Sequence, residues 1–598
     1  MKKVLLLISL FFLPIFASAY VGENYRSFSG LEEMKEVTVN EIDHSASVFV
    51  SPDGDDENDG TIDSPLKTIN AAVKKAVCYN TIYLREGTYN EPVVIDKSNL
   101  TLRNYPGEEA IITGIDLDGT TANVIVNQNI INIKIYGLKF QDRQEKDIEA
   151  AYGIIVYGGC KDIIIQNNEF KNINGNNSHY WDLYGYNAGA IALYGDGEYP
   201  IQNALITGNK IHDMDCGKSE AIIINGYVNK VDVIENEIND IFNIGIDVAG
   251  HYGANSDPNK DYARYVYVAG NKISNAVSTI ADNGGIYVDG AKGVLVERNY
   301  ITGCPFGISV GQENNITDSN LHVEDVVVSY NYIESSIKGG IRVGTNKLLG
   351  SSVFNSVVIN NTIIQDPTAG SGSLVIGKSH DNEFVNNVVY DKGSWHNIVL
   401  TDDNSTEEEI YNTIIQHNYL YSTNHMWYEG GRYFKIAGAH MTEAEFDAVE
   451  NYKDNIIGQQ YALTDKNVIV AGTPLEIKGT NHEYKSILRD YEGKLGTDVI
   501  GMGYININSR EETDETQAEL KSVFPFKKNY LVAMPSDRKF CDCDNKVASI
   551  NETEEVPEVK GEEETNHNPK TNDNILKYIL LFMVGTLSLV VIKRQYNN

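Results

Sequence analysis

Two short patterns recur through the middle of the chain and restrict its fold more than any other feature. In the first, alternating aliphatic residues lead to Asn, any residue, and then an aliphatic or aromatic residue. In the second, strand-like segments resemble Gly-Ile-x-Val-x-Gly and alternate with the first pattern. The repeated asparagines are Asn168, Asn209, Asn236, Asn271, Asn299, Asn331, Asn361 and Asn418, and the second pattern begins at Gly153, Ala190, Ala221, Gly245, Gly285, Gly307 and Gly340.

Strands this short, with glycine or asparagine at each corner, cannot bury an apolar face alone. Equivalent strands begin between 22 residues apart (Gly285 to Gly307) and 40 residues apart (Gly245 to Gly285). Such spacing fits the turns of a solenoid that carries loops at its corners, and stacked turns bury one continuous interior. The sequence therefore predicts an all-β fold, a single-stranded right-handed parallel β-helix, in which the asparagines form an internal ladder.

The start of this region resembles a known superfamily. Residues 48–54, 65–76 and 82–89 are similar to the opening of the secreted pectate-lyase-like β-helix proteins. The resemblance implies that an amphipathic helix, at about Leu66–Val77, caps the first coil.

The other end of the region, at residues 489–493 and 500–504, resembles the closing coil of the same superfamily. We therefore expect the β-helix, as the catalytic domain, to span residues 48–506. The superfamily includes lyases, hydrolases, epimerases and inert adhesins, so the resemblance is specific for the fold and weak for the function.

The composition restricts the partners. The chain has 83 Asp and Glu against 49 Lys and Arg, a formal charge of −34. Nucleic acid requires a basic surface, and a polyanionic ligand would be repelled unless a cation helped it to bind. Six cysteines in 598 residues are too few for a disulfide scaffold, and their spacing fits no zinc site.

The two ends of the chain predict an extracellular location. Residues 1–19 have the charged start, apolar stretch and small-residue end of a secretory signal peptide. Residues 507–567 include an acidic stretch of little apolar content, which predicts a solvated spacer. Residues 575–592 form an apolar segment that Lys593 and Arg594 follow, as in a membrane-spanning helix with a cytoplasmic end.

The last residues, 568–598, resemble the sorting signals of Gram-positive bacteria. The short motif of Asn568, Pro569 and Thr571 precedes the apolar segment and the basic tail. The resemblance implies that a sortase cleaves after Thr571 and links the protein to peptidoglycan. The alternative is a simple C-terminal membrane anchor. Under both interpretations, the apolar segment 575–592 is the part of the chain that contacts the membrane.

Alternation within the second pattern locates a candidate active site. The Ile and Val of each strand face the interior, so the intervening residues face outward. Polar and charged residues gather in the outward positions of the central turns, and the segments between those turns add more. The strands supply Asp247, Tyr287, Asp289 and Arg342, and the connecting segments supply His251, Tyr252, Asp282 and Glu313.

Asp289 is the residue on which two interpretations of the catalytic pair agree. Asp247 and Asp289 should lie on adjacent turns with Cα atoms roughly 8 Å apart, close enough for a glycosidase carboxylate pair. Residues 281–290 also resemble the active-site turn of lacto-N-biosidase-type glycoside hydrolases, which implies Asp282 and Asp289 as acid/base and nucleophile. That second pair requires the turn at 283–285 to fold Asp282 back over the strand. The alternative to both interpretations is that these aspartates are only solvated carboxylates on the surface.

The remaining candidates are substrate-binding residues. Tyr287, Arg342, His251, Tyr252 and Glu313 surround the aspartates in sequence. An insertion at residues 176–186 carries Trp181 and Tyr184, whose rings could form the wall of a sugar subsite or pack the loop onto the coil.

No cofactor is required by these patterns. The acidic run of residues 53–60 raises the alternative of a calcium site, but its glycine positions do not match an EF-hand, and such runs are usually turns.

Three functions are compatible with these patterns. The first is a surface glycoside hydrolase that cleaves neutral oligosaccharides with paired aspartates, as the lacto-N-biosidase resemblance implies. The second is a polysaccharide lyase on uronate glycans, with Lys338 or Arg342 as its base and calcium to offset the charge. The third is a non-catalytic glycan-binding adhesin.

Overall fold

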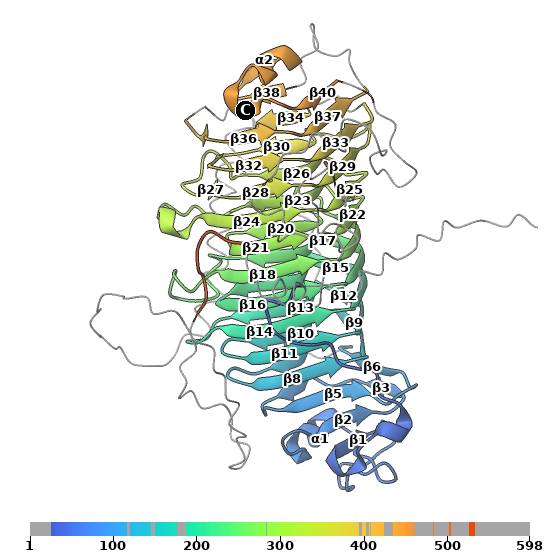
Figure 1. The fold of residues 1–598 in the computed structure, drawn as a ribbon. Coiled ribbons are helices and arrows are strands. Elements are labelled where there is room, and N and C mark those ends of the chain that lie inside the picture. Colours follow the sequence, from blue (N-terminus) through green and yellow to red (C-terminus); the bar gives the residue numbers. More distant parts are fainter. Residues whose placement is uncertain are drawn as a thin grey trace, which may run out of the picture.

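The chain folds into a right-handed parallel β-helix (Figure 1), as the repeats predict. The computed structural model describes residues 26–115, 120–144, 150–175, 187–282, 284–393, 398–401, 406, 408–423, 434–458, 460, 482, 502–503 and 525–532. Its strands form three faces, which we name A, B and C, and neighbouring strands on each face are parallel except for one hairpin of β38 and β39.

Face A is a 16-stranded sheet. Its strands are β1 (Ser47–Val50), β2 (Thr81–Leu84), β5 (Leu100–Asn104), β8 (Ile131–Tyr136), β11 (Lys161–Gln166), β14 (Ile201–Thr207), β16 (Val228–Ile234), β18 (Ala263–Ala269), β21 (Lys292–Glu297), β24 (Val323–Ser329), β27 (Val353–Phe354), β28 (Val357–Ile359), β31 (Ser379–His380), β32 (Glu383–Val385), β35 (Ile410–Tyr411) and β36 (Ile414–Gln416).

Faces B and C join through two long strands that cross the corner between them, β15 (Lys210–Gly226) and β17 (Glu237–Ala249). Face B also holds β3 (Gly87–Tyr89), β6 (Ala110–Thr113), β9 (Lys139–Gln144), β12 (Glu169–Asn174), β19 (Lys272–Val277), β22 (Tyr300–Thr302), β25 (Tyr332–Glu334), β29 (Thr362–Gln365), β33 (Val388–Asp391), β37 (Tyr419–Ser422) and β40 (Ile456–Ile457). Face C also holds β4 (Val93–Ile95), β7 (Ala122–Val126), β10 (Ala150–Tyr157), β13 (Asn187–Gly195), β20 (Ile286–Asp289), β23 (Phe306–Gly311), β26 (Gly339–Val343), β30 (Leu374–Ile376), β34 (Val399–Thr401), β38 (Phe434–Ile436) and β39 (Ala439–Met441).

The described helices are short. The α-helices are α1 (Ile69–Lys75) and α2 (Glu443–Asp447), and the 3-10 helices are Val39–Glu41, His44–Ala46, Ser319–Leu321 and Glu450–Tyr452. Helix α1 buries Ile69, Ala72 and Val73 against the first coil, as a capping helix should. It is shorter than the expected Leu66–Val77.

The acidic run of residues 53–60 serves this cap. The Asp56 carboxylate accepts hydrogen bonds from the backbone N–H groups of Lys67 and Thr68 just before α1. Within the described ranges, no cluster of three or more His, Cys, Asp or Glu side chains is arranged to hold a metal ion.

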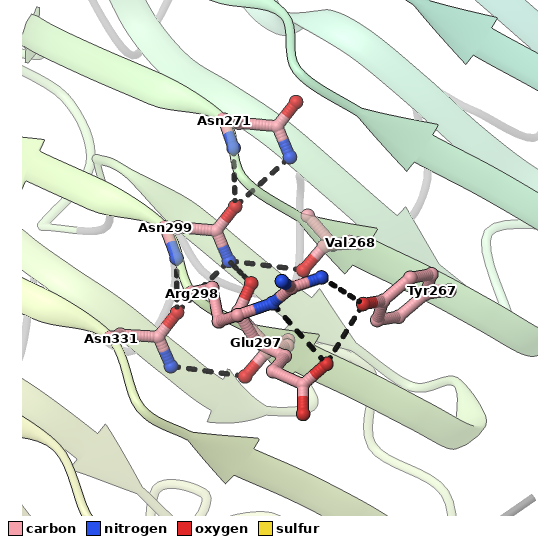
Figure 2. Close-up of polar contacts among 8 residues, drawn as sticks. Tyr267, Val268, Asn271, Glu297, Arg298, Asn299 and Asn331 are labelled. Carbon is pink, nitrogen blue, oxygen red and sulfur yellow. Dashed lines mark hydrogen bonds and ion pairs between the residues drawn. The ribbon is translucent and has the colours of Figure 1, made fainter. Parts of the chain in front are cut away.

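The interior contains the expected asparagine ladder (Figure 2). Asn299 Oδ1 accepts hydrogen bonds of 3.0 Å from both the backbone N and Nδ2 of Asn271. Asn299 in turn donates from both nitrogens to Asn331 Oδ1 at 2.9 Å. The predicted stacking of Asn209, Asn236, Asn271, Asn299 and Asn331 is confirmed, and the ladder also includes Asn387 and Asn455, which the sequence pattern did not identify.

Loss of one rung should therefore lower stability. Asn299→Ala leaves the backbone N–H of Asn271 without its acceptor inside a dry core and leaves its side-chain amide only the Val233 carbonyl, so we expect the free energy of unfolding to fall by about 2–4 kcal/mol. Denaturant unfolding of the purified chain measures this change. Lys272→Ala, at an exposed position directly after the ladder residue Asn271, is the control and should change stability by less than about 0.5 kcal/mol. Equal effects of the two substitutions would contradict the ladder's role.

Both ends of the described chain pack against the middle of face A. Asp232 on β16 accepts hydrogen bonds from the backbone N–H groups of Phe28 and Ser29, at 2.9 and 3.1 Å. Phe28 then joins an outer apolar cluster with Tyr265 and Tyr267, against which Phe526 and Tyr530 also pack. The folded body thus includes residues before the expected boundary at 48, and residues 525–532 of the expected spacer lie on it.

The targeting signals predicted from the sequence lie outside the described residues and stay predictions. This applies to the signal peptide at 1–19, to Asn568, Pro569 and Thr571, and to the apolar segment 575–592. In the part of the chain that the structure describes, no helix is long and apolar enough to cross a membrane.

Candidate active site

The outward column of face C has the register expected from the repeats. Asp247 on β17 pairs with Tyr287 on β20, which pairs with Ser309 on β23 and then with Arg342 on β26. Asp289 lies two residues beyond Tyr287 and pairs with Gly311. A Cβ atom at Gly311 would lie 3.3 Å from the Tyr287 hydroxyl, so glycine makes room there for that ring. The strands therefore place Asp247, Tyr287 and Asp289 on one surface.

Asp289 is almost completely buried, with 1% of its surface exposed. Its Oδ2 accepts a hydrogen bond from the Tyr252 hydroxyl, and its Oδ1 accepts one of 2.9 Å from the backbone N–H of Glu313. Burial, followed by the charge of Glu313, raises the pKa of Asp289 well above its usual range, and the two hydrogen bonds oppose this rise. Asp289 is thus a fixed carboxylate with both oxygens engaged.

Glu313 occupies the loop after β23, beside Asp289. Its side chain reaches solvent, yet the protein crowds around the carboxyl and this loss of hydration raises its pKa. The Arg342 charge and a hydrogen bond with Tyr252 act in the opposite direction. The Tyr252 hydroxyl therefore contacts both Asp289 and Glu313.

A second pair of acidic side chains lies beside the first. Asp247 is 5% exposed, and its pKa is raised well above the usual range by burial and then by the charges of Glu220 and Asp289. Burial also raises the pKa of half-buried Glu220 to about 8. Asp247 Oδ1 has no hydrogen-bond partner within the described ranges. Four interacting carboxyl groups on one surface strongly disfavour complete ionisation.

Sequence reasoning missed Glu220. The repeat pattern that identified outward residues begins one position later, at Ala221. In addition, the register between β15 and β17 shifts between Asp215 and Glu220, so strict alternation does not extend across this point. The signal available in the sequence was an acidic residue, Glu220, directly before one copy of the Gly-Ile-x-Val-x-Gly pattern.

His251 and Arg342 have supporting positions. The imidazole of His251 packs against the Tyr262 ring, with centroids 5.5 Å apart, and burial lowers its pKa to about 4. It is therefore neutral near pH 7. Arg342 is half-buried, and its charge opposes the rise in the pKa of both Glu313 and Tyr287.

Asp282 precedes Ile286, the first residue of β20, by four positions, whereas Asp289 is the last residue of that strand. The backbone N–H of Gly245 on β17 bonds to the carbonyl of Gly284, so strand pairing starts directly after this turn. Five extended residues from Gly284 to Asp289 cover roughly 16 Å. Exposed Asp282 forms an ion pair with Lys338, which also precedes its strand. Among the described contacts none joins Asp282 to Asp289, whereas several link Asp289 to Glu313.

The proposed aromatic wall cannot be located, since Trp181 and Tyr184 lie outside the described residues. The structure thus brings together Asp247, Asp289, Tyr287, Tyr252, Glu313 and Arg342, and adds Glu220 to them.

Comparisons with known proteins agree with the fold. No protein-family model matches the chain. An uncharacterized protein of Bacillus subtilis (strain 168), YwoF, is 28% identical over 391 residues, which are 62% of this chain and 80% of that protein. Pectate lyase PEL9 of Emericella nidulans is 32% identical over 199 residues, and the matched part covers 30% of this chain and 46% of that enzyme.

Comparison with solved structures gives matches of low TM-score. A complex of XylC with xylose has a TM-score of 0.44 at 12% identity, and the match covers 78% of this chain and 99% of that one. A GH136 lacto-N-biosidase from Eubacterium ramulus has a TM-score of 0.39 at 13% identity, with 70% and 68% covered. Pectate lyase Pel9A has a TM-score of 0.39 at 14% identity, with 81% and 99% covered. All three TM-scores are below 0.5, so neither the fold nor the function of this chain is argued from these matches.

Proposed function

We propose that this protein is a carbohydrate-active enzyme, a glycoside hydrolase that cleaves neutral glycans with Asp289 and Glu313 as its reacting carboxyl groups. One observation carries the proposal: the Tyr252 hydroxyl contacts both side chains, and Asp289 also bonds to the backbone of Glu313. Glycosidases need two carboxyl groups in different environments, one to stabilise or attack the anomeric carbon and one to protonate the leaving oxygen.

The environments of the two residues suggest which role each has. Asp289 is buried and held at both oxygens, as a nucleophile aimed at one carbon atom must be. Glu313 reaches solvent, where a leaving group departs and water enters, so its carboxyl group can deliver a proton to the departing oxygen. This assignment replaces Asp282 and Asp247 as partners of Asp289.

The shared hydroxyl also suggests the stereochemistry. Two oxygens that bond to one hydroxyl oxygen lie at most about 6 Å apart, because an O–H···O hydrogen bond spans at most about 3 Å. This separation matches retaining glycosidases, at about 5–5.5 Å, and is shorter than the 6.5–9.5 Å of inverting enzymes. A glycosyl-enzyme intermediate on Asp289 is the expected consequence.

The charges of the site favour an uncharged sugar. Glu220, Asp247, Asp289 and Glu313 lie close enough together for their charges to raise one another's pKa, and the charge of Arg342 opposes this rise at Glu313. A uronate in this position would be repelled by like charges at short range.

The partial similarity to a pectate lyase favours a second candidate, β-elimination on a uronate glycan. In that reaction Arg342 or Lys338 would serve as the base. However, Lys338 is paired with Asp282, away from Asp289.

A substrate panel tests the proposal. Purified protein is incubated with 4-nitrophenyl glycosides of neutral pentoses and hexoses, with neutral oligosaccharides, and with polygalacturonate. We expect release of nitrophenol or new reducing ends from neutral compounds, and no unsaturated uronate from polygalacturonate. Unsaturated products would instead establish the lyase, and binding without turnover of any compound would favour the adhesin.

A further inference from the structure

The loop that carries Tyr252 is organised around a single buried carboxylate. This loop joins β17 to β18, and its two ends meet in an isolated bridge between Gly250 and Tyr262. Tyr252 lies near its start, where its hydroxyl reaches Asp289. The carboxylate belongs to Asp261, close to the other end of the loop, and is 4% exposed.

Asp261 binds the backbone on both sides of Tyr252. Its main-chain carbonyl accepts a hydrogen bond of 2.5 Å from the N–H of His251. Its side chain accepts one of 2.7 Å from the N–H of Gly253 and one of 2.9 Å from the N–H of Asn255. The side chain of Asn255 in turn donates to the Gly197 carbonyl after β13, which ties the loop to a turn of the solenoid two coils earlier.

The backbone at Tyr252 needs such support. His251 and Gly253 both have left-handed conformations, with φ of 68° and 78°. A non-glycine residue in that region is unfavourable unless the surrounding contacts fix it. Without the Asp261 carboxylate, the part-buried N–H of Gly253 and the buried N–H of Asn255 would lose their acceptor, and the turn would lose its main constraint.

We propose that Asp261 is a positioning residue: by holding the backbone on both sides of Tyr252, it fixes the Tyr252 hydroxyl between Asp289 and Glu313. Its effect on catalysis rests on the proposed glycoside hydrolase activity, whereas its effect on the loop does not. Asp261 itself contacts neither reacting carboxyl group in the described structure.

The expected consequence is a change in the protonation of Asp289. The groups around Asp289 are Tyr252 from this loop, Glu313 from the loop after β23, Asp247 and Glu220 from β17 and β15, Tyr287 from β20 and Arg342 from β26. The Tyr252 hydrogen bond lowers the pKa of Asp289. Because a nucleophile must be ionised, loss of this bond moves the acidic limb of the activity profile to higher pH.

Three variants test the positioning role: Asp261→Asn, Tyr252→Phe and the double variant. An amide at 261 presents a donor toward N–H groups, so both Asp261→Asn and Tyr252→Phe should lower kcat/KM about tenfold and shift the acidic limb upward by similar amounts. The double variant should be no worse than Tyr252→Phe, because both changes remove the same contact. Additive losses, or an unshifted acidic limb in Asp261→Asn, would overturn the proposal.

A second measurement does not depend on activity. Hydrogen–deuterium exchange of the peptide that contains Tyr252 to Asn255 should become at least about tenfold faster in Asp261→Asn. Asp232→Asn is the matched control, since Asp232 is another buried carboxylate that binds backbone N–H groups, at Phe28 and Ser29. It should lower the melting temperature and leave both this peptide and the acidic limb unchanged. Unchanged exchange in Asp261→Asn overturns the proposal, whereas faster exchange in a chain with no glycosidase activity contradicts the proposed function alone.

Discussion

Asp289→Asn should lower kcat at least about 10³-fold on any neutral glycoside that the protein cleaves, with KM changed by less than about threefold. The carboxylate acts on a carbon that gains positive charge only in the transition state, so its loss raises the barrier by about 4 kcal/mol or more and affects ground-state binding little. Steady-state kinetics of the purified variant measure both constants. The side chain is buried among Tyr252, Glu313 and Tyr287, and asparagine has nearly its shape, so the fold should be retained.

An external nucleophile separates loss of the attacking group from general damage. Asp289→Ala leaves a space in which azide can attack the anomeric carbon, so azide should restore turnover and give a glycosyl azide of configuration opposite to the substrate. Proton NMR of the wild-type product should show retained configuration. Full activity of Asp289→Asn, or inverted wild-type products, would contradict the assignment of Asp289 as nucleophile.

The fold and the outward surface could be predicted because they depend on local, repeated rules. Each turn repeats the same alternation, so Ile308 and Val310 on one side and Ser309 on the other fix which residues face outward. An asparagine at the same corner of every turn can only stack on its neighbours. The pairs Asp247 with Tyr287 and Asp289 with Gly311 follow from that register.

The partner of Asp289 could not be predicted because it comes from loops. Glu313 and Tyr252 lie on loops after β23 and β17, where no repeat sets the backbone path. Their positions depend on contacts such as those of Asp261 with Gly253, which join residues of no regular spacing. Phe28 and Tyr530 pack on face A through an outer apolar cluster. The alternation rule assigns the strand residues of this cluster to solvent, so it does not predict this packing. Glu313 was identified from sequence as a binding residue, but its hydrogen bond with Tyr252 was not.

Glu313→Gln should produce an effect that depends on the leaving group. Glycosides with a sugar or alkyl leaving group need a proton on the departing oxygen, so their kcat/KM should fall about 10²- to 10⁴-fold. The nitrophenolate of a 4-nitrophenyl glycoside leaves without protonation. With these substrates kcat/KM for the first step should therefore fall far less. The raised pKa of Glu313 keeps it protonated to higher pH than an ordinary glutamic acid, so the wild-type profile should have a basic limb above the usual glutamic acid range. That limb should be absent in the variant.

Asp247→Asn and Asp282→Asn are the comparisons that make this result specific to Glu313. Asp282 is exposed and paired with Lys338, so its variant should keep near wild-type rates on every leaving group. The Asp247 charge is part of the carboxyl cluster that raises the pKa of its neighbours, so Asp247→Asn should move the acidic limb, set by Asp289, to lower pH. Neither variant should show a dependence on leaving group. If Asp282→Asn shows that dependence and Glu313→Gln does not, the acid is Asp282, and the turn at 283–285 brings it to Asp289 when substrate binds.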